Sequence, residues 1–190
     1  VIEVWGDFAC FSRPELKVER WSYPCPTPSA ARGIFDSIYC KGWNRNTGDS
    51  QFRWQVEKIE LLQEPVYIAL RRNEVKDKVS EPSVRKWMFG KATTVPIWAD
   101  ADKSLTGSDT KGRTQRQTMA LRQPRYRLHA HIVPRAGFEE QQQAFNRQFI
   151  RRATHGKCLQ QPYFGCREFV AFFRYFESPH GQPKPVRYTQ

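Results

Sequence analysis

The 190-residue sequence has no CxxC pair among its five cysteines and no cysteine-histidine cluster at zinc-finger spacing. An odd number of scattered cysteines gives no disulfide framework, so we expect reduced thiols, as in the cytosol. No apolar run approaches the roughly 18 residues that a membrane-spanning helix needs, and no signal peptide is visible. A zinc finger, a disulfide-stabilised secreted domain and a helical membrane protein are therefore excluded. Because the chain begins at Val1 without a methionine, we also expect it to be trimmed.

Acidic residues are few: 19 Asp and Glu stand against 31 Lys and Arg, giving a net charge of +12. The sequence is rich in aromatic residues, with 13 Phe, 7 Tyr and 6 Trp. Cations neutralise phosphates and aromatic rings stack on bases, so the combination favours a nucleic-acid partner. A ribosome-like or merely soluble basic protein is the alternative, because net charge constrains function loosely. A membrane surface is disfavoured, because no suitable basic amphipathic helix is found.

The N-terminal third predicts a strand followed by a helix. The stretch VIEVWGDFACF alternates as a strand, with a bend at Gly6. In TPSAARGIFDSIYCK, Thr27 and Pro28 suit an N-cap and a first helical position. The helix is predicted by apolar residues at i, i+3, i+4 and i+7, which are Ala31, Ile34, Phe35 and Ile38. Tyr39 lies off this apolar stripe.

The middle of the chain predicts strands and a loop. FRWQVEKIELLQ alternates and then shifts its phase by one residue, which indicates a bulge or a strand end. YIALRRNEV is typical of another strand. The polar segment from about residue 80 to 115 predicts a long loop, to which we assign no chemistry.

The C-terminal part predicts two strands, a helix and a last strand. TMALRQPRYRLHAHIVP gives two strand pieces around a Gln-Pro turn. FEEQQQAFNRQFIRRATHGK gives a second helix that ends at Gly156. CREFVAFFRYFE is typical of an aromatic strand. The order predicts an α+β, ferredoxin-like fold, in which an antiparallel sheet carries two helices on one face, with β-rich insertions.

Four separated motifs carry a family resemblance. They are VWGDFACFSRPELKVERWSYPCPTPSAARGIFDSIYCK, RRNEV, RTQRQTMALR and QPYFGCREF. The sequence thereby resembles the Cas-five proteins of type I-C CRISPR systems, of the Dvulg subtype in the RAMP superfamily. The resemblance implies a ferredoxin-like RAMP domain, here residues 1–178 with a long loop around 90–115. It also implies a C-terminal β extension, of which the tail 179–190 would be the truncated start.

The function implied by this resemblance is RNA processing in the prokaryotic cytoplasm. Such proteins cleave the CRISPR precursor RNA in its repeat hairpin and keep the crRNA 5′ handle within a Cascade-type complex. Metal-independent cleavage requires a deprotonated 2′-hydroxyl, a protonated 5′ leaving oxygen and cations near the phosphate. A noncatalytic subunit that caps the crRNA 5′ handle and a subunit that binds double-stranded DNA are the alternatives.

The resemblance marks Tyr39 as catalytic. A tyrosine with a pKa near 10 is a poor base, but Lys41 and neighbouring arginines would favour its ionised form or let it orient the 2′-hydroxyl. The sequence alone also allows a helix-end tyrosine that only packs its ring. Related proteins pair the tyrosine with an adjacent lysine and histidine, but this sequence has no Lys-His dipeptide. His155 and Lys157 are the nearest substitutes by chemistry, although His155 could equally interact with a helix dipole.

We expect neither a cofactor nor a metal. His129 and His131 project to one strand face, but no cysteine or carboxylate accompanies them at a recognisable spacing, and two ligands do not make a site. They are expected to be strand residues that touch RNA at most. Clustered arginines are the candidates for phosphate contacts. These RNA-binding candidates are Arg71, Arg72, Arg113, Arg116, Arg147, Arg151 and Arg152.

Overall fold

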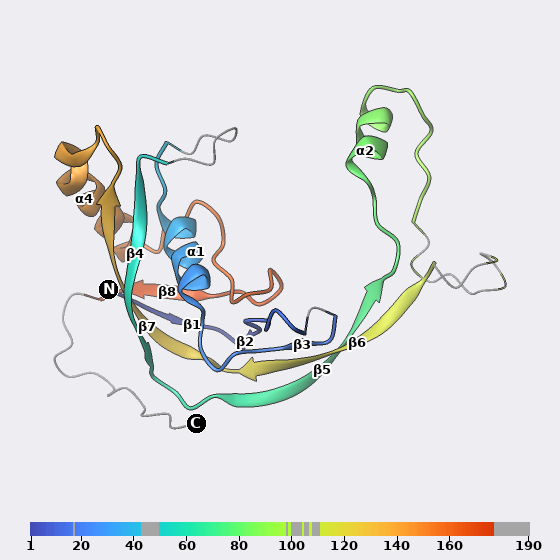
Figure 1. The fold of residues 1–190 in the computed structure, drawn as a ribbon, viewed down its shortest axis with the longest axis horizontal. Coiled ribbons are helices and arrows are strands. Elements are labelled where there is room, and N and C mark those ends of the chain that lie inside the picture. The colour runs from blue at the N-terminus through green and yellow to red at the C-terminus, as the bar shows by residue number, and fades with distance from the viewer. Residues whose placement is uncertain are drawn as a thin grey trace. The chain divides into compact units, whose positions relative to one another are not determined.

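The computed structural model describes residues 1–16, 18–42, 50–97, 99, 104, 107 and 111–176. Figure 1 shows the elements along the chain. The strands are β1 (Ile2–Trp5), β2 (Phe8–Ala9), β3 (Arg20–Trp21), β4 (Phe52–Leu61), β5 (Val66–Val75), β6 (Arg113–Arg122), β7 (Arg125–Pro134) and β8 (Phe172–Tyr175). The helices are α1 (Pro28–Ile38), α2 (Glu81–Met88), the 3-10 helix η1 (Glu139–Gln141) and α4 (Gln142–Thr154).

The chain forms two compact units. The first comprises residues 1–69 and 119–190, and the second comprises residues 70–118. β5 and β6 pair with each other and run through both units. The predicted boundary at residue 178 and the tail 179–190 lie outside the described residues. No helix among the described residues is long and apolar enough to cross a membrane.

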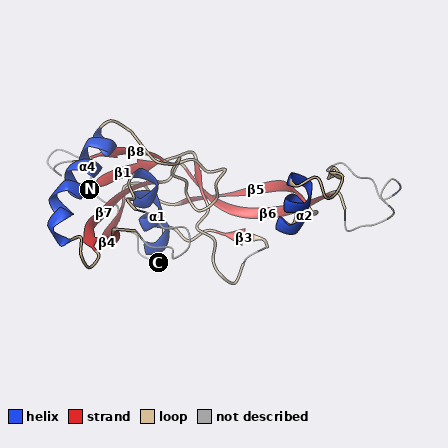
Figure 2. Cartoon of the chain, turned by 90° about the horizontal axis from the view of Figure 1, so that it is seen from above, coloured by secondary structure: helices blue, strands red, loops and turns tan. Residues whose placement is uncertain are grey.

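The main sheet of the first unit has the strand order β4-β7-β1-β8, and its neighbouring strands are antiparallel. The ring of Trp54 in β4 lies 4.8 Å from that of Phe35 in α1 and 4.6 Å from that of Phe149 in α4. One strand side chain thus touches both helices, so α1 and α4 cover the same face of the sheet (Figure 1, Figure 2). The observed class is α+β with antiparallel sheets.

The predicted first helix is confirmed. The Thr27 side chain accepts a hydrogen bond from the backbone N–H of Ala30, as an N-cap residue should, and Pro28 begins the helix. The predicted stripe is buried: Ala31, Ile34, Phe35 and Ile38 are each at most 2% exposed. The strands predicted around the Gln-Pro turn are also confirmed as β6 and β7.

Two further sequence features have the predicted structural consequence. The register of β4 against β7 shifts between Val56 and Lys58, which is the bulge that the phase shift indicated. Gly6 lies between the end of β1 and the start of β2, at the predicted bend. A Cβ at this position would lie 2.5 Å from the carbonyl oxygen of Val170. Only glycine allows this close approach of two backbone segments.

Two predictions were wrong. Residues 81–88, assigned to a loop, form α2, because Ser80 caps the helix and Arg85 pairs with Glu81 one turn earlier. α2 buries no residue, so an apolar stripe could not reveal it. The aromatic strand predicted from residue 166 begins only at Phe172. The residues before it form a turn in which the N–H of Phe169 donates to the carbonyl of Cys166.

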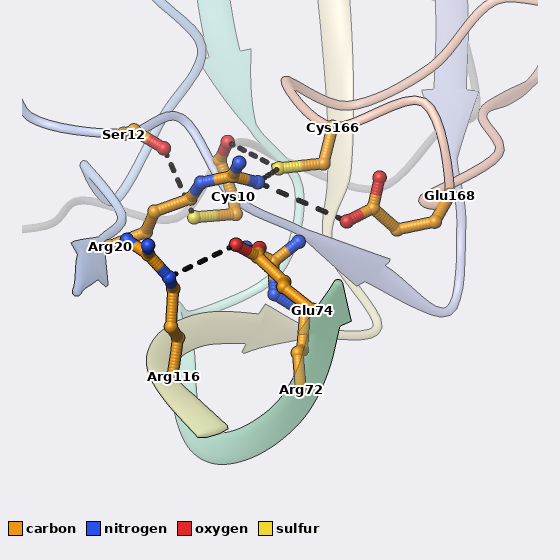
Figure 3. A network of polar contacts seen from close by, with 8 residues as sticks. All are labelled: Cys10, Ser12, Arg20, Arg72, Glu74, Arg116, Cys166 and Glu168. Carbon is orange, nitrogen blue, oxygen red and sulfur yellow. Dashed lines mark hydrogen bonds and ion pairs between the residues drawn. The ribbon is translucent and has the colours of Figure 1, made fainter. Parts of the chain in front are cut away.

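A second sheet, in the order β2-β6-β3, follows the bend at Gly6. The turn before β8 is attached to it, because the N–H of Cys10 donates to the carbonyl of Phe164 at 3.0 Å. Arg20 adds a hydrogen bond to the sulfur of Cys166 at 3.0 Å and lies 3.9 Å from Glu168 (Figure 3). The structure describes all five cysteines and none of them forms a disulfide, and the two in this region, Cys10 and Cys166, are buried.

The face of the main sheet away from the helices contains a buried carboxylate. Glu3 in β1 is fully buried and forms ion pairs with Arg125 of β7 and Arg174 of β8, the latter at 2.9 Å. Although burial alone raises the pKa of Glu3, the hydrogen bonds and charges of Arg174 and Arg125 outweigh it, so the pKa is lowered from its ordinary 4.5. Glu3 therefore joins three adjacent strands as an anion.

We expect Glu3→Gln to destabilise the protein by about 1–3 kcal/mol at pH 7, because two arginines lose their anion. A lowered pKa in the folded state means that Glu3 stabilises the fold above pH 4.5 and that this contribution is lost as pH falls below that value. Urea unfolding from pH 7 to pH 3 should therefore show the two proteins converging at acid pH. Exposed Glu64→Gln is the control, and an equal loss at every pH would contradict the prediction.

Candidate active site

The C-terminal end of α1 is held by α4 and the segment after it. The Nε of Arg152 in α4 donates to the carbonyl of Ile38 at 2.8 Å. The backbone N–H groups of Leu159 and Gln160 donate to the carbonyl of Ser37 at 2.7 and 3.2 Å. The last carbonyls of a helix have no partner inside it. Here a distant part of the chain supplies the donors.

Tyr39 follows this helix end and has an extended backbone. Its N–H donates to the carbonyl of Phe35 at 2.9 Å, and its own carbonyl accepts a hydrogen bond from Nε1 of Trp54 at 3.0 Å. The ring lies 5.2 Å from that of Phe52, and the residue is only 6% exposed. Backbone and ring are thus both fixed by the core.

The environment of Tyr39 favours the protonated hydroxyl. Burial raises its pKa above the usual 10, and the nearby charge of Arg152 opposes this effect only in part. The charge of Arg152 favours the ionised form, as we expected of a nearby cation, but desolvation outweighs it. The other expected role, in which Tyr39 orients the 2′-hydroxyl, stays a prediction. With a pKa above 10, the Tyr39 hydroxyl is protonated at neutral pH and can donate a hydrogen bond.

Lys41 lies near the same aromatic residues. Its Nζ is 5.3 Å from the ring centroid of Phe145, and that ring lies 5.0 Å from Phe52, against which Tyr39 packs. The side chain is exposed, so a cation stands at the edge of an aromatic cluster. The sequence predicted Lys41 and neighbouring arginines near Tyr39. In the structure the charge of Arg152 acts on Tyr39, and Lys41 lies at the edge of the aromatic cluster against which Tyr39 packs.

His155 and Lys157 are exposed and follow α4. The Nδ1 of His155 lies 2.7 Å from the carbonyl oxygen of Arg151. A carbonyl only accepts, so Nδ1 carries the proton in this contact. The contact lies at the end of α4, and the helix-dipole alternative for His155 stays open. The N–H of Lys157 donates to the carbonyl of Arg152, so both residues leave α4 beside the arginine that caps α1.

Among the predicted RNA-binding arginines, those of the second unit divide into two faces of the β5-β6 pair. Arg72 and Arg116 share Glu74, at 2.8 and 3.2 Å (Figure 3). Strand alternation places Arg71 and Arg113 on the opposite face, and both are exposed. In the first unit, Arg147 and Arg151 on α4 are exposed, whereas Arg152 caps α1.

The two strand histidines contact glutamates that sequence spacing did not reveal. His129 lies 3.5 Å from Glu60 and His131 lies 2.8 Å from Glu57, both across the β4-β7 pair. Glu60 also pairs with Arg127 at 2.9 Å, so this carboxylate serves an ion network. In the part of the chain that the structure describes, no group of three or more His, Cys, Asp or Glu residues could hold a metal ion.

The chain matches the family described as CRISPR-associated protein (Cas_Cas5) over residues 1–189. It belongs to this family. A relative from Mannheimia succiniciproducens, named CRISPR pre-crRNA endoribonuclease Cas5d, is 39% identical over 174 residues, which cover 90% of this chain and 70% of the relative. A relative of the same name from Thermus thermophilus is 35% identical over 181 residues, which cover 95% of this chain and 64% of the relative.

Solved structures show the same fold at low sequence identity. One described as a CRISPR-associated protein has a TM-score of 0.54, and SMU1763c from Streptococcus mutans, described as functionally uncharacterized, has 0.52. Each is 15% identical, and each match covers 93% of this chain and 65% of the other. This Cas5-family chain thus spans about two thirds of the length of the proteins it matches.

We expect Arg152→Met to destabilise this Cas5-family chain by about 1–3 kcal/mol, because the carbonyl of Ile38 loses a charged donor. The neighbouring exposed variant Arg151→Met should stay within about 0.5 kcal/mol of the parent protein. Urea unfolding of the three proteins at pH 7 gives the comparison. Equal stability of the two variants would show that the cap on α1 contributes nothing.

Proposed function

We propose that this chain is a metal-independent endoribonuclease that cleaves CRISPR precursor RNA in the repeat hairpin. We further propose that it retains the crRNA 5′ handle within a type I-C Cascade-type complex. The observation that carries this proposal is the position of Tyr39 at the end of α1, where the charge of Arg152 acts on its hydroxyl and the exposed Lys41 follows two residues later. Two relatives named pre-crRNA endoribonuclease support it, at 39% and 35% identity.

The proposed fold is ferredoxin-like. Six elements form the core of this arrangement in the order strand, helix, two strands, helix and strand: β1, α1, β4, β7, α4 and β8. The other helices and strands lie between them in the chain. The sheet order β4-β7-β1-β8 and the two helices on one face support the split βαβ arrangement. In such an arrangement the end of the first helix can present side chains without interrupting the sheet.

The proposed reaction begins with attack of the RNA 2′-hydroxyl on the adjacent phosphorus. The 2′-hydroxyl gives up its proton to a base and the bond from phosphorus to the 5′ oxygen breaks. The 5′ oxygen takes up a proton, which leaves a 2′,3′-cyclic phosphate and a 5′-hydroxyl. Tyr39, as a donor, would hydrogen-bond a reacting oxygen, and Lys41 would offset the charge that develops on the phosphate. Because the Nδ1–H of His155 donates a hydrogen bond to the carbonyl of Arg151, its Nε2 would be the nitrogen that accepts a proton. Lys157 would add a second cation.

We expect Tyr39→Phe to lower single-turnover cleavage of the chain's own repeat RNA in EDTA by about 10²–10⁴-fold. The phenyl ring can keep its packing against Phe52, so folding and RNA binding should be retained. Tyr23→Phe, on a tyrosine outside this region, is the control and should cleave normally. The product of the parent protein should carry a 2′,3′-cyclic phosphate, and undiminished cleavage by Tyr39→Phe would remove Tyr39 from the mechanism.

A noncatalytic subunit that caps the crRNA 5′ handle is the second candidate. The absence of a Lys-His dipeptide favours it, because the usual partners of the tyrosine are missing. Intact RNA on protein that is demonstrably saturated would establish this alternative and reject the nuclease. Within the nuclease proposal, normal cleavage by His155→Ala or Lys157→Ala would remove that residue from the site.

We expect the exposed arginines of the second unit to contribute more to RNA affinity than those that share Glu74. Arg71→Ala should lower the slope of log affinity against log salt by roughly 0.7 on single-stranded RNA. Arg72→Ala should change the slope less, because Glu74 already offsets its charge. Binding titrations between 50 and 300 mM salt would measure both slopes. A larger change for Arg72→Ala than for Arg71→Ala would contradict this ranking.

A further inference from the structure

A cavity of about 660 Å³ lies beside α1, within the first unit. Its lining comes from two places: one side of α1 and its end, and the segment that follows α4. Its lining includes Gly33, Asp36, Cys40, Gln160, Tyr163 and Gly165. The second segment is fastened to the first by the bonds from Leu159 and Gln160 to Ser37, and the ribbon shows the two side by side (Figure 1). A volume of this order suits a small organic group.

Gly33 lies in the middle of α1, where glycine is unfavourable. A glycine in a helix interior costs about 1 kcal/mol relative to alanine. No heavy atom lies within 4 Å of the position that a Cβ would occupy, and the backbone is not in a left-handed conformation. The packing of the described residues therefore does not require glycine here. What the missing side chain does provide is open space in the cavity wall.

Asp36 places a carboxylate in the same wall. It is half-buried, and burial raises its pKa, while the charge of Arg32 opposes the shift. Among the described residues, no hydrogen-bond donor is found for this carboxylate. A carboxylate repels phosphate and accepts hydrogen bonds, so in a chain of net charge +12 the cavity selects a ligand group other than the RNA backbone.

The cavity lining includes the residue that follows Tyr39 in sequence. Cys40 lines the cavity and follows Tyr39 directly. The carbonyl of Ser37, three residues earlier, accepts the hydrogen bonds that attach the segment after α4 to α1. Tyr163, a residue that is 36% exposed, supplies an aromatic ring, and Gln160 supplies an amide. An aromatic face beside polar acceptors is how proteins bind unstacked RNA bases.

We propose that this cavity binds one guanine base of the RNA, next to the cleaved linkage. Guanine's N1–H and N2–H would donate to the two oxygens of Asp36, and its ring would lie against Tyr163. The inference rests on the proposed function, because it assigns a base-reading site to the same nuclease. Guanine fits because it presents two adjacent donors, which a carboxylate accepts together. Adenine and cytosine each place an acceptor beside the amino group, and uracil has a single donor between two carbonyls.

The direct test uses the chain without RNA and the four ribonucleoside 5′-monophosphates, followed by amide NMR shifts of Gly33 and Gly165. Because the four ligands share the phosphate and the ribose, a difference among them reports on the base. We expect guanosine monophosphate to bind about tenfold or more tightly than the other three. Asp36→Asn should remove this preference. Equal responses to all four, or no response to guanosine monophosphate, would overturn the proposal.

Gly33 allows a matched pair of variants. Gly33→Ala and Gly33→Leu both replace a helical glycine with a better helix former, so neither should be less stable than the parent protein. Only leucine reaches far enough to fill the cavity. We therefore expect Gly33→Ala to retain the guanine preference and Gly33→Leu to lose it. Retention of the preference by a folded Gly33→Leu would also overturn the proposal.

A second experiment tests base binding in the cavity independently of the nuclease proposal. Repeat RNAs in which inosine replaces one guanine at a time lack the N2 amino group at that position. One such RNA should bind about tenfold more weakly to the parent protein and no more weakly to Gly33→Leu. Binding with this preference but without cleavage would leave the cavity standing and reject the nuclease. Cleavage with no dependence on any single guanine would reject the cavity's role and leave the nuclease standing.

Discussion

The C-terminal end of α1 depends on hydrogen bonds from residues more than a hundred positions later in the chain. Arg152 caps the carbonyl of Ile38, and the backbone of residues 159–160 caps that of Ser37. A helix end left without donors would fray and lose the geometry of the residues after it. The positions of Tyr39 and of the cavity wall at Cys40 are therefore set by how α4 docks. The candidate chemistry requires the tertiary fold, and not α1 alone.

Arginine serves two purposes in this basic chain. Arg125, Arg127 and Arg174 neutralise Glu3 and Glu60 on the face of the main sheet away from the helices, where these carboxylates are buried. Phe176 lies over Arg127, 4.7 Å from its guanidinium carbon. The net charge therefore overestimates the number of cationic side chains that are available to contact a phosphate. The arginines best suited to RNA are those that have no carboxylate neighbour among the described residues, such as Arg71 and Arg151.

Local signals predicted much of the fold. α1 was predictable because its cap and its apolar stripe are adjacent in sequence, and the bulge in β4 because alternation has a strict period of two. α2 could not be predicted by an apolar stripe, because it packs none of its residues. The start of β8 at Phe172 could not be predicted either, since Phe164 and Phe169 are buried although they lie in a turn and not in a strand. A high density of aromatic residues indicates burial, but it does not distinguish a buried turn from a buried strand.

The candidate site was predictable only in part, because its chemistry arises from contacts across the sequence. Tyr39 could be named from the resemblance, but the direction of its pKa follows from burial, which no local pattern gives. The protonated state changes the requirement on its partners, since a donor at Tyr39 leaves the base to another group. A missing Lys-His dipeptide is therefore less decisive than it first appears from sequence. A base and a cation can come from any segment that the capping bonds bring beside α1, and the segment carrying His155 and Lys157 is attached there.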